Sequence, residues 1–273
     1  MNIAKISLLV GFAFILGAVI GSFLNVCIYR IPAGESVVTP RSRCPHCQTT
    51  IHWYHNLPVI SWVLLKGRCA YCAAPFSIRY PLVETLTGVL FALFCFRFGL
   101  HPVTLVAWLL AAALVTISFI DLDHQIIPDV ISLPGIPIGF VCSLVLPWVT
   151  WQSSLLGILL GGGILLAIAL GYEWLTKQEG MGLGDVKLLA MLGAFLGVPA
   201  VLPVIFLASI MGTLVGVPLM LIKRAGRKLA IPFGPFLAAA ALVYLFFVDK
   251  IDPVARWYGE VLGFWWKNLG AGG

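Results

Sequence analysis

The chain has 273 residues, of which 60% are hydrophobic and only 10% charged, and its mean hydropathy is +1.02. Ordinary soluble domains are about 45–50% apolar and about 25% charged. The charge needed to solvate a soluble enzyme, a disordered chain or a nucleic-acid-binding domain is therefore missing. The composition predicts a polytopic integral membrane protein that contacts the lipid bilayer and binds no nucleic acid.

Eight apolar runs follow one another along the chain, and a helical crossing needs roughly 20 residues. The pattern therefore predicts an all-α membrane protein with about eight transmembrane helices. The first run is too long for the apolar part of a signal peptide, so we expect it to be retained. The eight runs are 6–29, 81–98, 102–120, 130–148, 154–173, 186–198, 200–222 and 233–248.

Two of these runs are unusual. The run 186–198 is short for a full crossing, and the run 130–148 contains Pro134 and Pro137. Either helix is therefore expected to be tilted, kinked or partly re-entrant.

The predicted domains are a first transmembrane helix (1–30), a polar module (31–79), a seven-helix membrane domain (80–250) and a C-terminal tail (251–273). The tail carries Trp257, Trp265 and Trp266 and either lies on the outer membrane surface or packs on the bundle. With residues 31–79 in the cytoplasm, 12 Lys and Arg fall inside and five outside. Positive charge favours cytoplasmic loops, so this orientation is predicted.

The polar module contains two C-x-x-C pairs separated by 21 residues, which is close to a common zinc spacing. Two such pairs supply a closed tetrahedral shell of four sulfurs, which folds a loop and performs no chemistry on water. Disulfides or redox dithiols are the alternative, and a cytoplasmic location disfavours them. We expect His46, His52 and His55 to be surface or packing residues. The predicted zinc ligands are Cys44, Cys47, Cys69 and Cys72.

Four aspartates stand at the ends of two apolar runs, where the chain is expected to enter or leave the membrane. A charged side chain in the membrane is costly there. Asp121, Asp123 and Asp129 surround the end of the third run, and Asp185 follows Gly-Leu-Gly at the start of the sixth. Each alone is explained as a helix cap or an interfacial stop. Two carboxylates held together would instead share a proton and act as acid and base on a water that attacks a peptide carbonyl.

The sequence resembles the bacterial type IV prepilin peptidases, which are bifunctional leader peptidases and N-methyltransferases. The resemblance covers most of the chain and rests on several segments in order. These are Gly21-Ser-Phe-Leu-Asn-Val-Cys-Ile-Tyr-Arg-Ile-Pro32, Ser42-Arg-Cys-Pro-His-Cys47, Trp53-Tyr-His-Asn-Leu-Pro-Val-Ile-Ser-Trp62, Arg79-Tyr-Pro-Leu-Val-Glu84, Ile120-Asp-Leu-Asp-His-Gln-Ile-Ile-Pro-Asp129, Glu179-Gly-Met-Gly-Leu-Gly-Asp-Val-Lys187 and Pro232-Phe-Gly-Pro235.

The resemblance implies a GxGD-type aspartyl protease with an eight-helix fold in the bacterial inner membrane, with its active site at the cytoplasmic face. Its catalytic aspartates map to Asp121 and Asp185. Substrates would be prepilins or pseudopilins of pili or type II secretion, cut after a Gly that ends a basic leader. The new N-terminus would then be methylated from S-adenosyl-L-methionine. Further candidates near the acids are Asp123, His124, Asp129 and Lys187.

Residues that bind the methyl donor cannot be assigned, because no glycine-rich strand-to-helix signature occurs. Glu84 opens the second long apolar run, where it would either stabilise the helix start or help to bind the donor or the new amine. The same two interpretations apply to Asn25 and Arg30 near the inner end of the first helix.

Two other classes of function fit the composition. A proton-coupled transporter also has many apolar helices and a few membrane acids, but it would hold those acids near the midplane. A scaffold whose zinc module binds a cytoplasmic partner would need neither aspartate. The oligomeric state is not indicated by the sequence.

Overall fold

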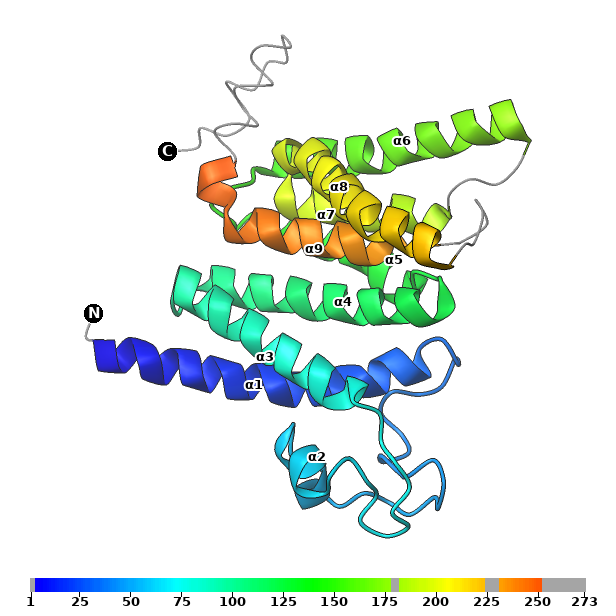
Figure 1. The fold of residues 1–273 in the computed structure, drawn as a ribbon. Coiled ribbons are helices and arrows are strands. Elements are labelled where there is room, and N and C mark those ends of the chain that lie inside the picture. The colour runs from blue at the N-terminus through cyan, green and yellow to red at the C-terminus, as the bar shows by residue number, and fades with distance from the viewer. Residues whose placement is uncertain (1–2, 178–181, 224–230, 252–273) are drawn as a thin grey trace. The chain divides into compact units, whose positions relative to one another are not determined.

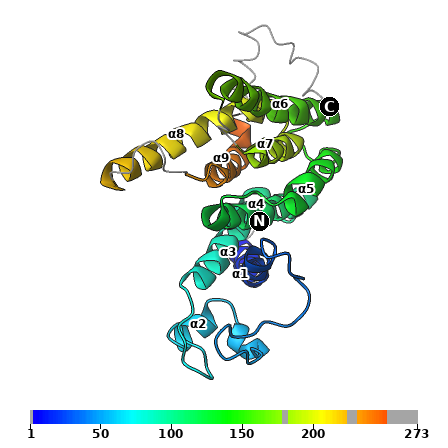
Figure 2. The ribbon, with the colours of Figure 1, turned by 90° about the vertical axis from the view of Figure 1, so that its right-hand side faces the viewer.

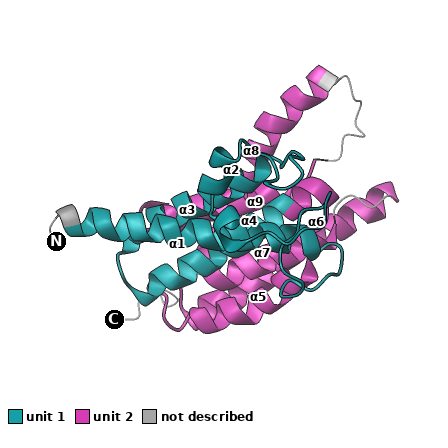
Figure 3. Cartoon of the chain, turned by 90° about the horizontal axis from the view of Figure 1, so that it is seen from below, with its two compact units in different colours: residues 1–119 teal, residues 120–273 magenta. Residues whose placement is uncertain are grey.

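The computed structural model describes residues 3–177, 182–223 and 231–251, and its regular elements there are all helical. The chain divides into two compact units, residues 1–119 and residues 120–273 (Figure 3). The boundary falls within one long helix, α4 (Pro102–His124).

Unit 1 is built on two helices, α1 (Ile3–Arg30) and α3 (Arg79–Phe98), that run side by side (Figure 1). Their backbones approach closely at glycines of α1. A Cβ added at Gly17 would lie 2.7 Å from the carbonyl oxygen of Thr87, and one added at Gly21 would lie 2.7 Å from the Cα of Glu84. Any larger residue at these positions would push the two helices apart.

The polar module, residues 31–78, links α1 to α3. It contains a single turn of 3₁₀ helix, η1 (Trp53–Asn56), and the five-residue helix α2 (Ile60–Leu64). The Arg30 guanidinium anchors the start of the module by donating to the carbonyl oxygens of Ser36 and Pro40, both at 2.8 Å. Few apolar side chains of the module are buried, so packing alone is a weak source of stability for it.

Unit 2 is organised around the short helix α7 (Leu183–Leu196), which packs against α5 (Asp129–Cys142), α6 (Trp151–Thr176), α8 (Val198–Lys223) and α9 (Gly234–Phe246). Figure 2 shows these helices from a second direction. Residues 188–197 are all buried. From Leu188 onward α7 is apolar on every side and enclosed by other helices, as is typical of a core helix.

All eight predicted apolar runs are helical, and five of these helices are long and apolar enough to cross a membrane: α1, α3, α4, α6 and α8. The helices α5, α7 and α9 have only 14, 14 and 13 residues. The fourth run ends as a helix at Cys142 and not at residue 148, and both of its prolines lie inside α5. The tail tryptophans Trp257, Trp265 and Trp266 lie outside the described residues.

The packing of α6 on α7 generates a stability prediction. A Cβ at Gly157 would lie 2.4 Å from the Gly193 carbonyl oxygen, whereas a Cβ at Gly163, on the same helix, would meet nothing within 4 Å. We expect Gly157→Ala to cost about 1–3 kcal/mol through overpacking. Gly163→Ala should be neutral or slightly stabilising because alanine favours helix. Thermal unfolding of the two detergent-purified variants measures the difference, and equal melting temperatures would contradict the close backbone contact.

Candidate active site and metal centre

Asp121 lies in the last turn of α4 with its side chain turned into unit 2. It is only 5% exposed, whereas Asp123 and His124 in the same turn are exposed. Its Oδ2 accepts a hydrogen bond of 3.0 Å from the backbone N–H of Gly234, the first residue of α9. A Cβ at residue 234 would lie 2.7 Å from this oxygen, so the contact requires glycine.

Asp185 lies in the first turn of α7, directly after Gly184. A Cβ at Gly184 would lie 2.9 Å from the Cβ of Ile127, and a Cβ at Gly234 would lie 3.3 Å from the Cδ1 of the same isoleucine. The two glycines therefore converge on Ile127 from different helices. Asp185 directly follows Gly184, and Asp121 accepts a hydrogen bond from the N–H of Gly234, so the two acids flank the same isoleucine.

A pair of acids in this setting can perform acid–base chemistry. Two carboxyl groups held in such a site can share one proton, since like charges close together cannot both ionise cheaply. The arrangement then offers one proton acceptor and one proton donor on neighbouring side chains.

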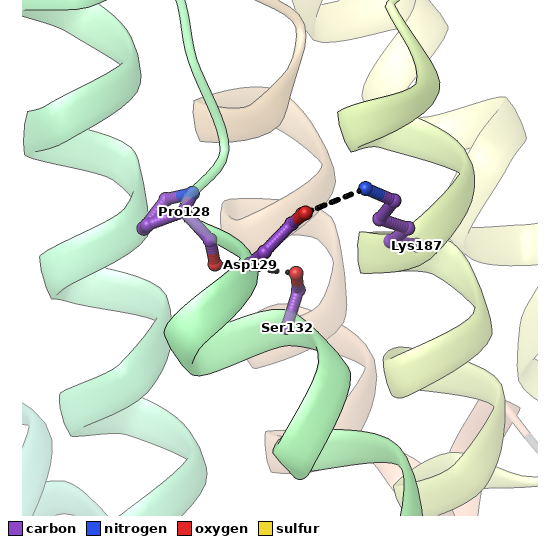
Figure 4. A network of polar contacts seen from close by, with 4 residues as sticks. All are labelled: Pro128, Asp129, Ser132 and Lys187. Atoms are coloured by element: carbon purple, nitrogen blue, oxygen red, sulfur yellow. Dashed lines mark hydrogen bonds and ion pairs between the residues drawn. The ribbon is translucent and has the colours of Figure 1, made fainter. Parts of the chain in front are cut away.

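Asp129 and Lys187 form an ion pair beside this site (Figure 4). The Lys187 ammonium donates to both carboxylate oxygens of Asp129, at 2.8 and 2.9 Å, and so ties the start of α5 to α7. The N-cap positions of α5 and α7 are occupied by Pro128 and Gly182, with no side-chain capping bond. Asp129 and Asp185 are therefore not the N-caps of these helices, although both lie in the first turn, where a negative charge is favourable to the helix dipole.

The four cysteines of the two C-x-x-C pairs come together as predicted. Their sulfur atoms all lie within 4.8 Å of one another, and all four thiols are free. The Sγ atoms of Cys44 and Cys72 are 3.8 Å apart. Sulfurs around a tetrahedral zinc, with Zn–S of about 2.3 Å, stand about 3.8 Å from each other. His46, His52 and His55 are not part of this cluster.

The two cysteine turns have the same backbone geometry. In each, the N–H of the first cysteine donates to a carbonyl five residues on, from Cys44 to Thr49 and from Cys69 to Ala74. In each, the fourth residue after that cysteine has a positive φ, 57° at Gln48 and 56° at Ala73. Sequence spacing alone did not predict this repeat of backbone conformation, which presents four sulfurs to one point.

The surroundings of two of the four cysteines, Cys47 and Cys69, favour the thiolate form that metals bind, whereas burial and the neighbouring thiols raise the pKa of the Cys72 thiol to about 11. Hydrogen bonds from the side chain and the backbone of Thr49 lower the pKa of the Cys47 thiol to about 6. The backbone N–H groups of Cys72 and Tyr71 likewise lower the pKa of Cys69. The donor set therefore fits a metal ion with a preference for sulfur.

Glu84 is the sixth residue of α3, and no acidic residue lies in the first turn of that helix. Its predicted role in stabilising the helix start is therefore wrong. The side chain is 7% exposed and accepts a 2.7 Å hydrogen bond from the backbone N–H of Val59, a residue of the polar module. Ser22 of α1 also hydrogen-bonds to this carboxylate. Asn25 donates to the carbonyl oxygen of Tyr80 at 3.1 Å.

Comparison with known proteins identifies both segments. A family model described as the Bacterial Peptidase A24 N-terminal domain matches residues 15–98, which include the cysteine cluster and Glu84. A model described as the Type IV leader peptidase family matches residues 108–217, which include Asp121 and Asp185.

Several relatives share a printed name, prepilin leader peptidase/N-methyltransferase. The one from Aeromonas hydrophila is 38% identical over 90% of this chain and 92% of its own. The one from Neisseria gonorrhoeae is 37% identical over 90% of this chain and 93% of its own. The one from Myxococcus xanthus is 42% identical over 80% of this chain and 65% of its own. No solved structure matches the chain.

The cysteine geometry predicts one tightly bound metal ion per chain. Cys69→Ser removes one of the four sulfurs and should reduce the bound metal well below one equivalent. Cys142→Ser, a change of a cysteine in α5, should leave the metal content unchanged. Elemental mass spectrometry of the purified proteins measures both. A metal-free wild type prepared without chelators would contradict the prediction.

Proposed function

Because the chain belongs to the type IV leader peptidase family, we propose that it removes the leader from prepilins or pseudopilins and then methylates the new N-terminus. The observation that supports the peptidase half is that Gly184, which precedes Asp185, and Gly234, which donates to Asp121, both approach Ile127 in unit 2. Cleavage is proposed to follow the Gly that ends a short basic leader, at the cytoplasmic face of the bacterial inner membrane.

The proposed hydrolysis uses the two carboxyl groups in turn. The ionised one accepts a proton from water as the water oxygen bonds to the scissile carbonyl carbon. The protonated one donates its proton to the carbonyl oxygen. Collapse of the tetrahedral intermediate then breaks the C–N bond, and the leaving nitrogen takes up a proton to become a free amine.

The second reaction is methyl transfer to that amine. The nitrogen lone pair attacks the methyl group of S-adenosyl-L-methionine, the bond from carbon to sulfur breaks, and the amine loses a proton. The sulfur of the donor loses its positive charge, and the demethylated donor leaves as a neutral thioether. This step follows cleavage because only hydrolysis creates the free N-terminus.

The four-cysteine cluster is proposed to hold a structural Zn²⁺ ion. A closed shell of four thiolates leaves no position for water or substrate, so the ion would fold the polar module and take no part in hydrolysis. In this proposal all eight apolar helices are membrane-embedded, with the polar module in the cytoplasm, as the distribution of Lys and Arg favours. The shorter helices α5, α7 and α9 would be surrounded by protein in part.

The aspartates give the sharpest test of the peptidase. Asp121→Asn or Asp185→Asn should lower prepilin cleavage by about 10²–10⁴-fold, because an amide cannot exchange the proton. The control variant Asp249→Asn changes an exposed acid that follows α9. The protein that carries it should cleave prepilin as the wild type does. Mass spectrometry of the product measures leader removal.

Cleavage at near wild-type rate by either site variant would refute the assignment. No cleavage of several prepilins by metal-loaded wild type would favour the transporter or scaffold functions instead.

The contact between Gly234 and Asp121 gives a second test. Gly234→Ala places a methyl group 2.7 Å from Oδ2 and must displace the carboxylate. A shift of about 1 Å at a reacting group costs about 10²-fold in rate. We expect kcat to fall with little change in KM, since the substrate contacts are untouched. Gly171→Ala, where a Cβ meets nothing within 4 Å, is the matched control. Equal kcat values for the two variants would contradict a positioning role for Gly234.

A further inference from the structure

A cavity of about 480 Å³ lies in unit 1 between the polar module and the adjoining ends of α1 and α3. Small-molecule sites typically span about 300–1,000 Å³, so the cavity is large enough for a cofactor-sized ligand. One wall comes from the two helices and includes Ser22, Asn25, Tyr80 and Glu84. The opposite wall comes from the module.

The helix wall carries the buried carboxyl group of Glu84 and the Arg30 guanidinium, which is bound to the carbonyl oxygens of Ser36 and Pro40. Glu84 is only 7% exposed. Its carboxyl group contacts the backbone N–H of Val59 and the hydroxyl of Ser22, and neither group carries a charge that could neutralise a carboxylate. In the part of the chain that the structure describes, no lysine, arginine or histidine pairs with it. A buried carboxylate without a counter-ion is costly, and a cationic ligand in the cavity would offset that cost.

The module segment that donates a hydrogen bond to Glu84 has a strained backbone. Val59, whose N–H binds the carboxylate, has φ 60° and ψ −48° at the centre of a γ-turn closed by a bond from the Ile60 N–H to the Pro58 carbonyl. A β-branched residue rarely adopts a positive φ, and such strain concentrates at ligand sites. The γ-turn fixes the carboxylate without supplying positive charge.

The module wall carries two arginines in equivalent places, together with one acidic residue, Glu35. Arg43 and Arg68 each precede the first cysteine of one C-x-x-C turn, and both line the cavity. Both form the bridge that closes their turn, Arg43 with Thr50 and Arg68 with Pro75. The repeated backbone of the metal cluster thus directs two guanidinium groups toward one space. Guanidinium groups bind carboxylates well.

Aromatic side chains complete the lining. Trp62 is held by a 3.3 Å hydrogen bond from its indole N–H to the Phe76 carbonyl, and Phe76 and Tyr80 lie with ring centroids 6.0 Å apart. All three line the cavity. Aromatic faces stack on flat heterocycles and attract cations.

We propose that this cavity binds the methyl donor, with Glu84 beside its positive charge and Arg43 and Arg68 beside its carboxylate. The inference rests on the proposed methyltransferase activity and names the site for it. A sulfonium donor of the S-adenosylmethionine class combines a cation, an amino acid with its carboxylate, and a flat purine. A cleaved N-terminal amine carries only the cation and leaves the two arginines without a partner.

The test is direct binding of S-adenosylmethionine to the full-length, metal-loaded protein in detergent, measured by calorimetry. We expect Glu84→Gln and Arg68→Gln each to weaken binding at least ten-fold. Two exposed residues that do not line the cavity supply matched controls, Glu173→Gln in α6 and Arg41→Gln in the module, and these should bind as wild type does. Metal content and melting temperature check the fold of each variant.

Photochemical crosslinking of labelled S-adenosylmethionine to the wild type provides a second measurement that needs no variant. Label is expected on peptides within residues 53–84. Donor binding that is unaffected by both cavity variants, or label found only in residues 120–251, would overturn the cavity assignment and leave the proposed function standing. A wild type that cleaves prepilin but binds no donor would overturn the methyltransferase half and the cavity assignment together.

Discussion

Close approach of helix backbones at glycine is the constraint on which the rest of this structure depends. Lipid tails are as apolar as leucine, so helices in a bilayer gain little from burying apolar side chains and rely on close contact. In unit 1, Gly17 and Gly21 let α1 lie against the backbone of α3, and Gly21 faces Glu84 itself. In unit 2, Gly157 and Gly193 bring α6 against α7, which carries Asp185. The same contacts that assemble the helices therefore position the acids.

The polar module needs another source of stability, because it contains no pair of long helices that could pack together. Its ordered turns are those that direct four sulfurs inward, and the bonds of Arg30 to Ser36 and Pro40 fix where the module begins. A bound ion would therefore replace the missing apolar core. Since Arg43 and Arg68 are part of the two cysteine turns, the order of the cavity wall would depend on the same ion.

Much of this could be predicted from the sequence, since apolar length and cysteine spacing are local signals. The eight helical runs and the four-cysteine cluster come directly from them. The roles of Asp121 and Asp185 remain predictions, although the two acids flank the same isoleucine. The position of Glu84 was missed because the helix begins at Arg79, a boundary that apolar periodicity does not define. The γ-turn at Val59 and the contact of Gly234 with Asp121 join segments 25 and 113 residues apart, and no local pattern encodes them.

The two buried acids, Asp121 and Glu84, are held in the same way, which fits the roles proposed for them. Asp121 is held by the N–H of Gly234 and Glu84 by the N–H of Val59, so each acid is oriented by a backbone dipole from a distant segment. A lysine or arginine in the same place would orient the acid equally well but would also neutralise it. Asp129 differs, since the Lys187 ammonium pairs with its carboxylate and ties α5 to α7. In the proposed reactions, a backbone donor would fix the position of each carboxyl group and leave it free to bind a proton at one site and a cationic ligand at the other.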